Sequence, residues 1–356
     1  MLTDYIRARR PLWHYAQALK RGKLTVGFVG GSITEPSHGQ RWSDKLVDDI
    51  IYTHPGLTVN VENAAKGATG SLSAIFRVDR DVLPYDCDIV FVETAVNDDP
   101  EARGACREGL IRKLLADGRF DVVLVYTYCY DFYKAFLNRE LPDSIRDWEQ
   151  LAERYQVPAV FSGLHAFDTL CDGYLRYEEW LPDGLHPQQA GSRVYAEPIA
   201  RLLADNENAE PAAPVALPSP LYENHWGRSY ILPWEKVTRV GPWRLTHCRR
   251  FPTVDYILYT ASVRASLSFD FEGRGIVLRT NLNKLAAGCE WRVDGGEWKS
   301  TCDPLPDWGK NATDWVDEEL LTDSLPDGVH HFELKVMFRE GNVGTNFELC
   351  TIGVVR

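Results

Sequence analysis

The chain has no excess of basic residues: 39 lysines and arginines stand against 51 aspartates and glutamates, which gives a formal net charge of −12. A nucleic-acid-binding protein needs a basic face that releases counterions, so this balance argues against nucleic acid as a partner. It also disfavours binding to an anionic membrane surface. No apolar run approaches the ~20 residues of a membrane span, and we therefore expect no membrane partner.

The sequence also lacks any Cys-x-x-Cys pair among its eight cysteines, which excludes zinc-ribbon and thioredoxin-like sites. Residues 1–23 carry charges throughout and contain no continuous apolar segment of the kind found in secretory signals. We therefore expect a cytoplasmic protein whose cysteines are reduced, buried thiols rather than disulfides.

The first two thirds of the chain alternate between strand-like and helix-like patterns, and 356 residues favour more than one domain. Predicted strands cover residues 24–30, 57–61, 88–96, 122–128 and 159–161, and predicted helices cover 42–52, 72–83, 109–116, 144–155 and 188–203. This alternation indicates βαβ units. It predicts an α/β domain, a three-layer α/β/α sandwich around a parallel sheet.

A second domain is expected after a linker. Residues 205–220 are rich in proline, alanine and acidic residues and show no periodicity, which is typical of a linker. Residues 221–356 contain alternating apolar stretches separated by Gly, Asp, Asn and Pro turns, at 265–272, 275–280, 289–293 and 330–337. The predicted domains are therefore an α/β domain over 1–204 and an antiparallel β-sandwich over 221–356.

Ser32 lies in the sequence GGSIT, directly after the first predicted strand. Ligands of open α/β sheets bind beyond the carboxyl ends of the strands, so this serine is expected at the edge of a site. The two preceding glycines permit a tight turn that leaves the hydroxyl accessible. Taken alone, the motif fits an ordinary turn whose serine caps a helix equally well.

A second polar segment, DGLHP, precedes the last predicted helix of the α/β domain. Asp183 stands three residues before His186, so it can accept the imidazole Nδ1–H while Nε2 faces the serine. The alternative is a loop in which Asp183 caps a turn and His186 is solvated. The pairing with the serine motif favours the first interpretation.

Two more segments follow strands. Asn97 comes after the third strand, and its side-chain amide can donate to an oxyanion, although an Asn-Asp pair also suits a plain turn. Residues 63–71, NAAKGATGS, follow the second strand, where small residues allow a backbone N–H to approach a ligand or simply form a turn. Within the third strand, Glu93 is costly to bury unpaired and is expected to have satisfied structural partners.

These four segments, in this order after successive strands, resemble the four sequence blocks of the SGNH (GDSL-like) hydrolases. The GGSIT, NAAKGATGS and VETAVND segments are most similar to the carbohydrate-esterase branch of that superfamily. The resemblance covers residues 20–204 and implies a flavodoxin-like sandwich. It implies Ser32 as the nucleophile, His186 as its base and Asp183 as the group that orients the base.

The resemblance also implies an oxyanion hole formed by the N–H of Ser32, the side chain of Asn97 and a backbone N–H of the loop after the second strand. The spacing of that loop leaves the donor open between Gly67 and Ala68. The sequence departs from the family at Gly31, where many members have Asp, and at Ala95, ahead of Asn97, where many have Gly.

The function expected from this resemblance is that of a serine esterase that removes short acyl groups, chiefly acetyl, from carbohydrates through an acyl-enzyme. Such chemistry needs no metal or organic cofactor. The substrate would be a small-molecule or oligosaccharide ester. Two alternatives stay open: a lysophospholipase or thioesterase, and a carbohydrate-binding protein with a vestigial site.

Tryptophan is concentrated in the last third of the chain, where it serves either core packing or a sugar-binding platform. The residues concerned are Trp226, Trp234, Trp243, Trp291, Trp298, Trp308 and Trp315. The sequence leaves open whether the second domain binds substrate, covers the site or pairs subunits of a homo-oligomer.

Overall fold

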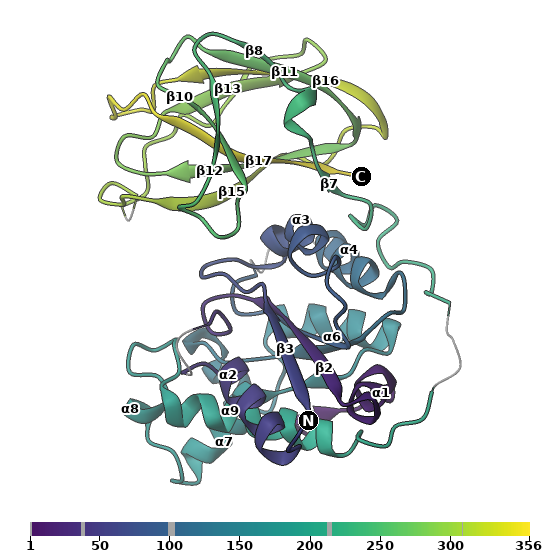
Figure 1. Cartoon of the computed structure of the whole chain (residues 1–356). Helices are drawn as coiled ribbons and strands as arrows, with labels where there is room; N and C mark the ends of the chain where they lie inside the picture. The colour runs from purple at the N-terminus through teal and green to yellow at the C-terminus, as the bar shows by residue number, and fades with distance from the viewer. Residues whose placement is uncertain (1, 37–39, 99–103, 212–215, 308) are drawn as a thin grey trace. The chain divides into compact units, whose positions relative to one another are not determined.

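A computed structural model describes residues 2–36, 40–98, 104–211, 216–307 and 309–356. Its contacts divide the chain into unit 1, Met1–Gly227, and unit 2, Arg228–Arg356 (Figure 1). Within the described ranges, no helix is long and apolar enough to cross a membrane. All eight cysteines are free, and four of them are buried.

The described strands of unit 1 form one sheet in the order β1-β6-β5-β4-β2-β3. Strands β2 to β6 are parallel and neighbour one another in the flavodoxin order, which confirms the expected fold. The short β1 pairs antiparallel with β6, so the sheet is mixed at this edge, where the sequence predicted parallel strands alone. The strands are β1 (Ile6–Arg7), β2 (Lys23–Gly30), β3 (Thr58–Asn63), β4 (Ile89–Glu93), β5 (Asp121–Val125) and β6 (Ala159–Val160).

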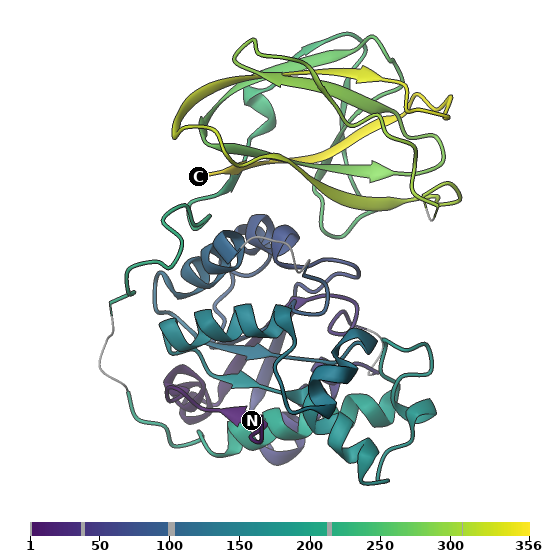
Figure 2. The same cartoon turned by 180° about the vertical axis from the view of Figure 1, so that it is seen from behind.

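Helices cover both faces of this sheet. On one face α3 packs against α4 and α4 against α6, while on the other α2 and α7 pack against α9 (Figures 1 and 2). The central strands β4 and β5 are buried at every residue, as their continuous apolar runs predicted. The helices are α1 (Trp13–Arg21), α2 (Trp42–Thr53), α3 (Ser71–Asp81), α4 (Gly104–Leu115), α5 (Tyr133–Leu137), α6 (Asp143–Tyr155), α7 (Ser162–Cys171), α8 (Tyr177–Trp180) and α9 (Gln189–Ala204).

The chain that follows α9 packs on unit 1 before it enters unit 2. The buried carboxylate of Glu108 accepts the N–H groups of Leu221 and Tyr222, each at 2.7 Å. Trp226 is buried and donates its backbone N–H to the carbonyl of Ala105 at 3.0 Å. Part of the stretch that follows the predicted linker therefore belongs to unit 1, and Trp226 with it.

Unit 2 is the expected antiparallel β-sandwich. Sheet B has the order β15-β12-β17-β10-β9, with β7 also paired to β17, and sheet C has the order β14-β13-β16-β11-β8. The strands are β7 (Tyr230–Ile231), β8 (Thr238–Val240), β9 (Arg244–His247), β10 (Tyr256–Thr260), β11 (Ser266–Gly273), β12 (Gly275–Leu282), β13 (Gly288–Val293), β14 (Lys299–Ser300), β15 (Trp315–Thr322), β16 (Gly328–Met337) and β17 (Phe347–Val355), and η2 (Trp234–Lys236) is a short 3-10 helix.

Alternate residues of the two sheets form one core between them. Leu258 and Leu349 come from sheet B, and Phe269 and Phe332 come from sheet C, where their rings stack 4.8 Å apart. The alternation seen in the sequence at 265–272 and 330–337 is therefore the alternation between this core and the outer face.

Most tryptophans of unit 2 pack against other side chains. Trp291 is buried beside Phe332, and Trp234 and Trp243 pack against the same core. The cations of Arg292 and Lys335 lie against the ring of Trp298. Trp315 is 41% exposed, and Trp308 lies outside the described residues. These contacts favour a packing role for most of the group.

Candidate active site

The structure brings together the three residues that the sequence predicts as a triad. Ser32 Oγ lies 2.7 Å from His186 Nε2, and His186 Nδ1 lies 2.7 Å from Asp183 Oδ2. Ser32 follows the carboxyl end of β2, whereas the other two residues lie in the loop before α9. This line of hydrogen bonds is the arrangement in which a histidine can take the proton of a serine hydroxyl.

The Asp183 carboxylate organises its own loop. Besides the imidazole, it accepts the backbone N–H of Leu185 at 3.0 Å and of His186 at 2.7 Å. Gly184 has φ of +83°, which a glycine adopts without strain. Partial burial raises the pKa of Asp183, but the hydrogen bonds from His186 and Leu185 outweigh it and lower the pKa to about 2. The carboxylate is therefore ionised at neutral pH and able to orient an Nδ1–H.

A buried carboxylate lies beneath the turn that carries Ser32. Glu93, at the end of β4, is fully buried and accepts the hydroxyls of Thr34 at 2.8 Å and Thr127 at 2.9 Å. It also accepts the backbone N–H of Gly31. Burial raises the pKa of Glu93 to about 7, although these three hydrogen bonds oppose the rise. Glu93 therefore ties the turn that carries Ser32 to the centre of the sheet, the satisfied structural role expected from the sequence.

We expect Glu93 to make the protein less stable as the pH rises. Its pKa is 4.5 in a free chain and about 7 in the fold, so between these values the folded protein keeps a proton that the unfolded chain has lost. From about pH 5 to about pH 8 this group should lower the free energy of unfolding by on the order of 2 kcal/mol. Urea unfolding of the wild type and of Glu93→Gln at both pH values measures this change in the free energy of unfolding. An identical pH dependence in the two proteins would contradict the assignment.

Asn97 lies directly over the turn that carries Ser32. A Cβ built on Gly31 would stand 2.1 Å from Asn97 Oδ1, so the amide occupies the space that a side chain at position 31 would need. The next residue, Asp98, is buried and accepts the N–H of Ser71 at 2.6 Å and the indole of Trp148 at 2.8 Å. These bonds join the segment after β4, next to Asn97, to the start of α3 and to α6.

The loop after β3 approaches Ser32 at Gly67. A Cβ at Gly67 would lie 3.6 Å from Ser32 Cβ. The Gly67 N–H donates to Glu35 Oε2 at 2.8 Å, and Lys66 Nζ lies 2.6 Å from Glu35 Oε1. Ala68 adopts a left-handed φ of +58°, and its N–H has no acceptor within the described ranges. No pattern in the sequence indicates that Glu35 accepts a hydrogen bond from Gly67, one of the two candidate oxyanion donors.

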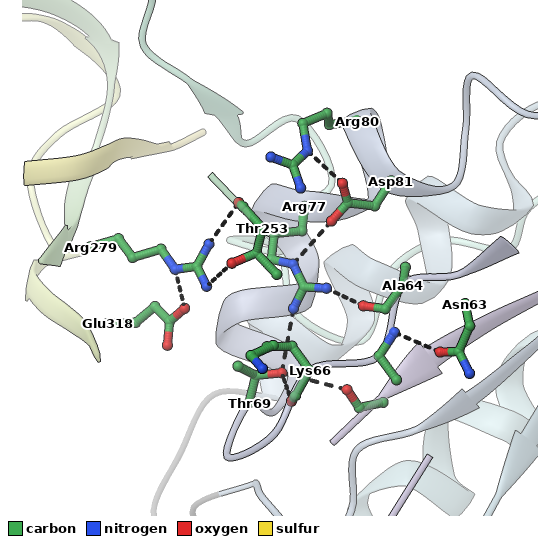
Figure 3. Close-up of polar contacts among 12 residues, drawn as sticks. Asn63, Ala64, Lys66, Thr69, Arg77, Arg80, Asp81, Thr253, Arg279 and Glu318 are labelled. Atoms are coloured by element: carbon green, nitrogen blue, oxygen red, sulfur yellow. Dashed lines mark hydrogen bonds and ion pairs between the residues drawn. The ribbon is translucent and has the colours of Figure 1, made fainter. Parts of the chain in front are cut away.

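Arg77 of α3 supports the loop after β3 through hydrogen bonds (Figure 3). It donates to the carbonyl of Ala64 and lies 3.4 Å from Thr69 Oγ1, and its other side pairs with Asp81 at 3.1 Å. The Thr69 hydroxyl in turn donates to Lys66 O at 2.7 Å. Sequence reasoning missed this residue because Arg77 lies between inward-facing apolar residues of an ordinary helical pattern, and only the fold shows what it contacts.

No family model and no curated protein matches the chain. Among solved structures, a two-domain esterase (CEX) active on acetylated mannans, co-crystallized with mannopentaose, is 24% identical with a TM-score of 0.83, covering 98% of this chain and 96% of that one. A second structure of this esterase is 22% identical with a TM-score of 0.81, covering 98% of both chains.

An acetylxylan esterase from Geobacillus stearothermophilus is 18% identical with a TM-score of 0.41 and covers 51% of this chain and 94% of that one. The likeness to the mannan-active esterase extends over both units. It shows that the α/β/α sandwich followed by a β-sandwich is the fold of a two-domain esterase.

Proposed function

We propose that this chain is a serine esterase that removes acetyl groups from acetylated oligo- or polysaccharides. The observation that carries the proposal is the continuous line from Ser32 Oγ through the imidazole of His186 to the carboxylate of Asp183, with 2.7 Å at each step. The alternative, a turn whose serine caps a helix, requires only the serine. It does not account for a histidine that contacts the hydroxyl and is oriented by an ionised carboxylate.

The reaction proceeds by acyl transfer to the serine and then to water. His186 Nε2 takes the hydroxyl proton as Ser32 Oγ attacks the ester carbonyl, and Asp183 stabilises the imidazolium that forms. The imidazolium gives its proton to the leaving sugar oxygen, which leaves an acetyl-serine. His186 then takes a proton from water as the water oxygen attacks the acetyl carbonyl. The bond from that carbonyl carbon to Ser32 Oγ breaks, the imidazolium returns its proton to Oγ, and acetate leaves.

Donors around Ser32 would hold the oxyanion. The Ser32 N–H has no acceptor in the described part of the chain, and the amide of Asn97 lies over the same turn. Ala68 offers a third N–H, whereas the Gly67 N–H must first leave Glu35. Each such donor lowers the barrier by on the order of 3 kcal/mol.

The carbohydrate part of the proposal has two supports. The whole-chain fold is shared with an esterase whose own substrates are acetylated mannans, and the sequence blocks resemble the carbohydrate-esterase branch. The histidine and aspartate side chains are 31% and 56% exposed, so acetyl groups on a bulky sugar chain can reach them.

The acyl specificity is tested with para-nitrophenyl acetate, butyrate and octanoate, together with acetate release from acetylated mannan and xylan oligosaccharides. Acetate preference with release from the oligosaccharides supports the proposal. Activity on octanoate alone would favour the lysophospholipase or thioesterase alternative. A fluorophosphonate probe that fails to label Ser32 would favour a binding protein with a vestigial site.

Gly31→Ala should lower kcat with little loss of stability. The added methyl displaces the flexible end of Asn97, because the two would stand 2.1 Å apart, and the displaced amide no longer faces the oxyanion. Loss of one oxyanion donor lowers kcat by about 100- to 1,000-fold. We expect a fall of this size for Asn97→Ala and for Gly31→Ala. If Gly31→Ala acts through Asn97, the double variant should fall no further than Asn97→Ala alone. Additive losses would show that Gly31 acts in another way.

A further inference from the structure

A row of polar side chains crosses the outer face of sheet B. Leu258 and Leu349 lie in the core, so their neighbours Tyr259 and Glu348 lie on the opposite face. Arg244 of β9 is directly opposite Tyr259 in the register, and paired residues of antiparallel strands share a face. The row therefore runs from Arg244 through Tyr259 to Glu348 over three neighbouring strands.

The loop between β9 and β10 forms a wall beside this row. Arg279 of β12 donates to the carbonyl of Thr253 at 3.2 Å and to its hydroxyl at 2.9 Å, and it pairs with Glu318 at 2.7 Å, which ties the loop to the sheet (Figure 3). The row and the loop border an open hollow of about 290 Å³ lined by residues of unit 2. Its volume lies just below the range of about 300–1,000 Å³ that is typical of small-ligand sites.

The hollow is basic although the chain as a whole is acidic. Arg244, Arg249 and Arg250 line it, and Glu348 is the one carboxylate in its lining. Arg250 pairs with Glu348 at 2.6 Å and with Asp314 at 3.3 Å, so its charge is compensated. Arg244 and Arg249 are exposed and form no ion pair or side-chain hydrogen bond with any residue that the structure describes. Two guanidinium groups are thus available to an anion.

We propose that this hollow binds the carboxylate of an acidic sugar, so that the polymer recognised by unit 2 carries uronic acid residues. Guanidinium groups pair with a planar carboxylate through two parallel N–H···O bonds. The Thr246 hydroxyl and the ring of Tyr259 line the same hollow and present a polar group and an aromatic surface to a sugar ring. The identity of the sugar chain as substrate rests on the proposed esterase function, but binding in unit 2 does not require the triad.

Binding is measured by calorimetry on the full-length Ser32→Ala protein, which cannot consume an ester. The probes are a xylotetraose carrying one glucuronic acid and the same oligosaccharide with its carboxylate reduced to an alcohol. We expect the acid to bind at least ten-fold more tightly, and its affinity to fall as the salt concentration rises. Arg244→Gln with Arg249→Gln should remove this preference. Arg264→Gln, at an exposed arginine outside the hollow, should retain it.

Equal affinity for the acidic and reduced probes would overturn the proposal, as would a preference that survives the double substitution. Inorganic phosphate or sulfate that competes as strongly as the acidic probe would show a general anion site and overturn the sugar assignment. Hydrolysis of para-nitrophenyl acetate by the wild type tests the esterase separately. An active esterase without acid preference removes this inference alone, and an inactive one with acid preference removes the esterase alone.

Discussion

Ser32→Ala should lower kcat for para-nitrophenyl acetate by about 10⁶-fold, and His186→Ala should lower it by a similar factor. In the proposed mechanism the serine is the nucleophile and the histidine, 2.7 Å away, is its base, so neither should function without the other. The double variant should therefore be no slower than either single variant. Steady-state rates of the three variants and the wild type measure this coupling.

His165→Ala is the matched control for the histidine. His165 lies on α7 and interacts with Glu197 at 2.9 Å, outside the triad, so its loss should leave the rate within a few-fold of wild type. A fluorophosphonate probe should label Ser32 in the control and fail on Ser32→Ala. Single-variant losses that multiply in the double variant would mean that the two residues do not act together.

Asp183→Asn should lower kcat by about 10⁴-fold while leaving the fold intact. The Asn amide can donate an N–H to His186 Nδ1, so the imidazole then carries its own proton on Nε2. In that tautomer Nε2 cannot accept the proton of the Ser32 hydroxyl. The amide can also keep its oxygen on the N–H groups of Leu185 and His186, so the loop should retain its shape. The measurement is kcat together with the thermal unfolding midpoint.

Asp172→Asn, an exposed aspartate at the end of α7, serves as the control and should keep wild-type activity. A fall of less than ten-fold in Asp183→Asn would show that this carboxylate does not orient the base. A large fall accompanied by a lower unfolding midpoint would point to a structural role instead.

Much of the fold could be predicted because local periodicity reports burial. The continuous apolar runs of β4 and β5 indicate strands covered on both faces, and the alternation of β11 and β16 indicates strands covered on one face. The candidate triad could be proposed because its residues follow a strand or lie in the loop before the last helix, where the topology brings them to one edge, and because their motifs resemble those of the SGNH hydrolases.

Other elements gave no such signal. Only Phe161 separates the end of β6 from the start of α7, and α7 has no capping side chain, so nothing marks its start. Along β17 the core residues are Leu349 and then Ile352, because a bulge against β12 interrupts the period of two. A pattern search for strict alternation misses such a strand.

The sequence by itself predicted an α/β domain with a parallel sheet and a following β-sandwich, because these depend on local pattern and on the direction of the chain. Together with the family resemblance, it also singled out Ser32, Asp183 and His186 as the candidate triad. Only the tertiary structure decided which groups surround them. That Glu35 accepts the Gly67 N–H, that Arg77 braces its loop and that Glu93 lies under the turn depend on side chains that meet across different elements. Such contacts leave no periodic pattern in the sequence, because the side chains come together only when the layers of the fold pack.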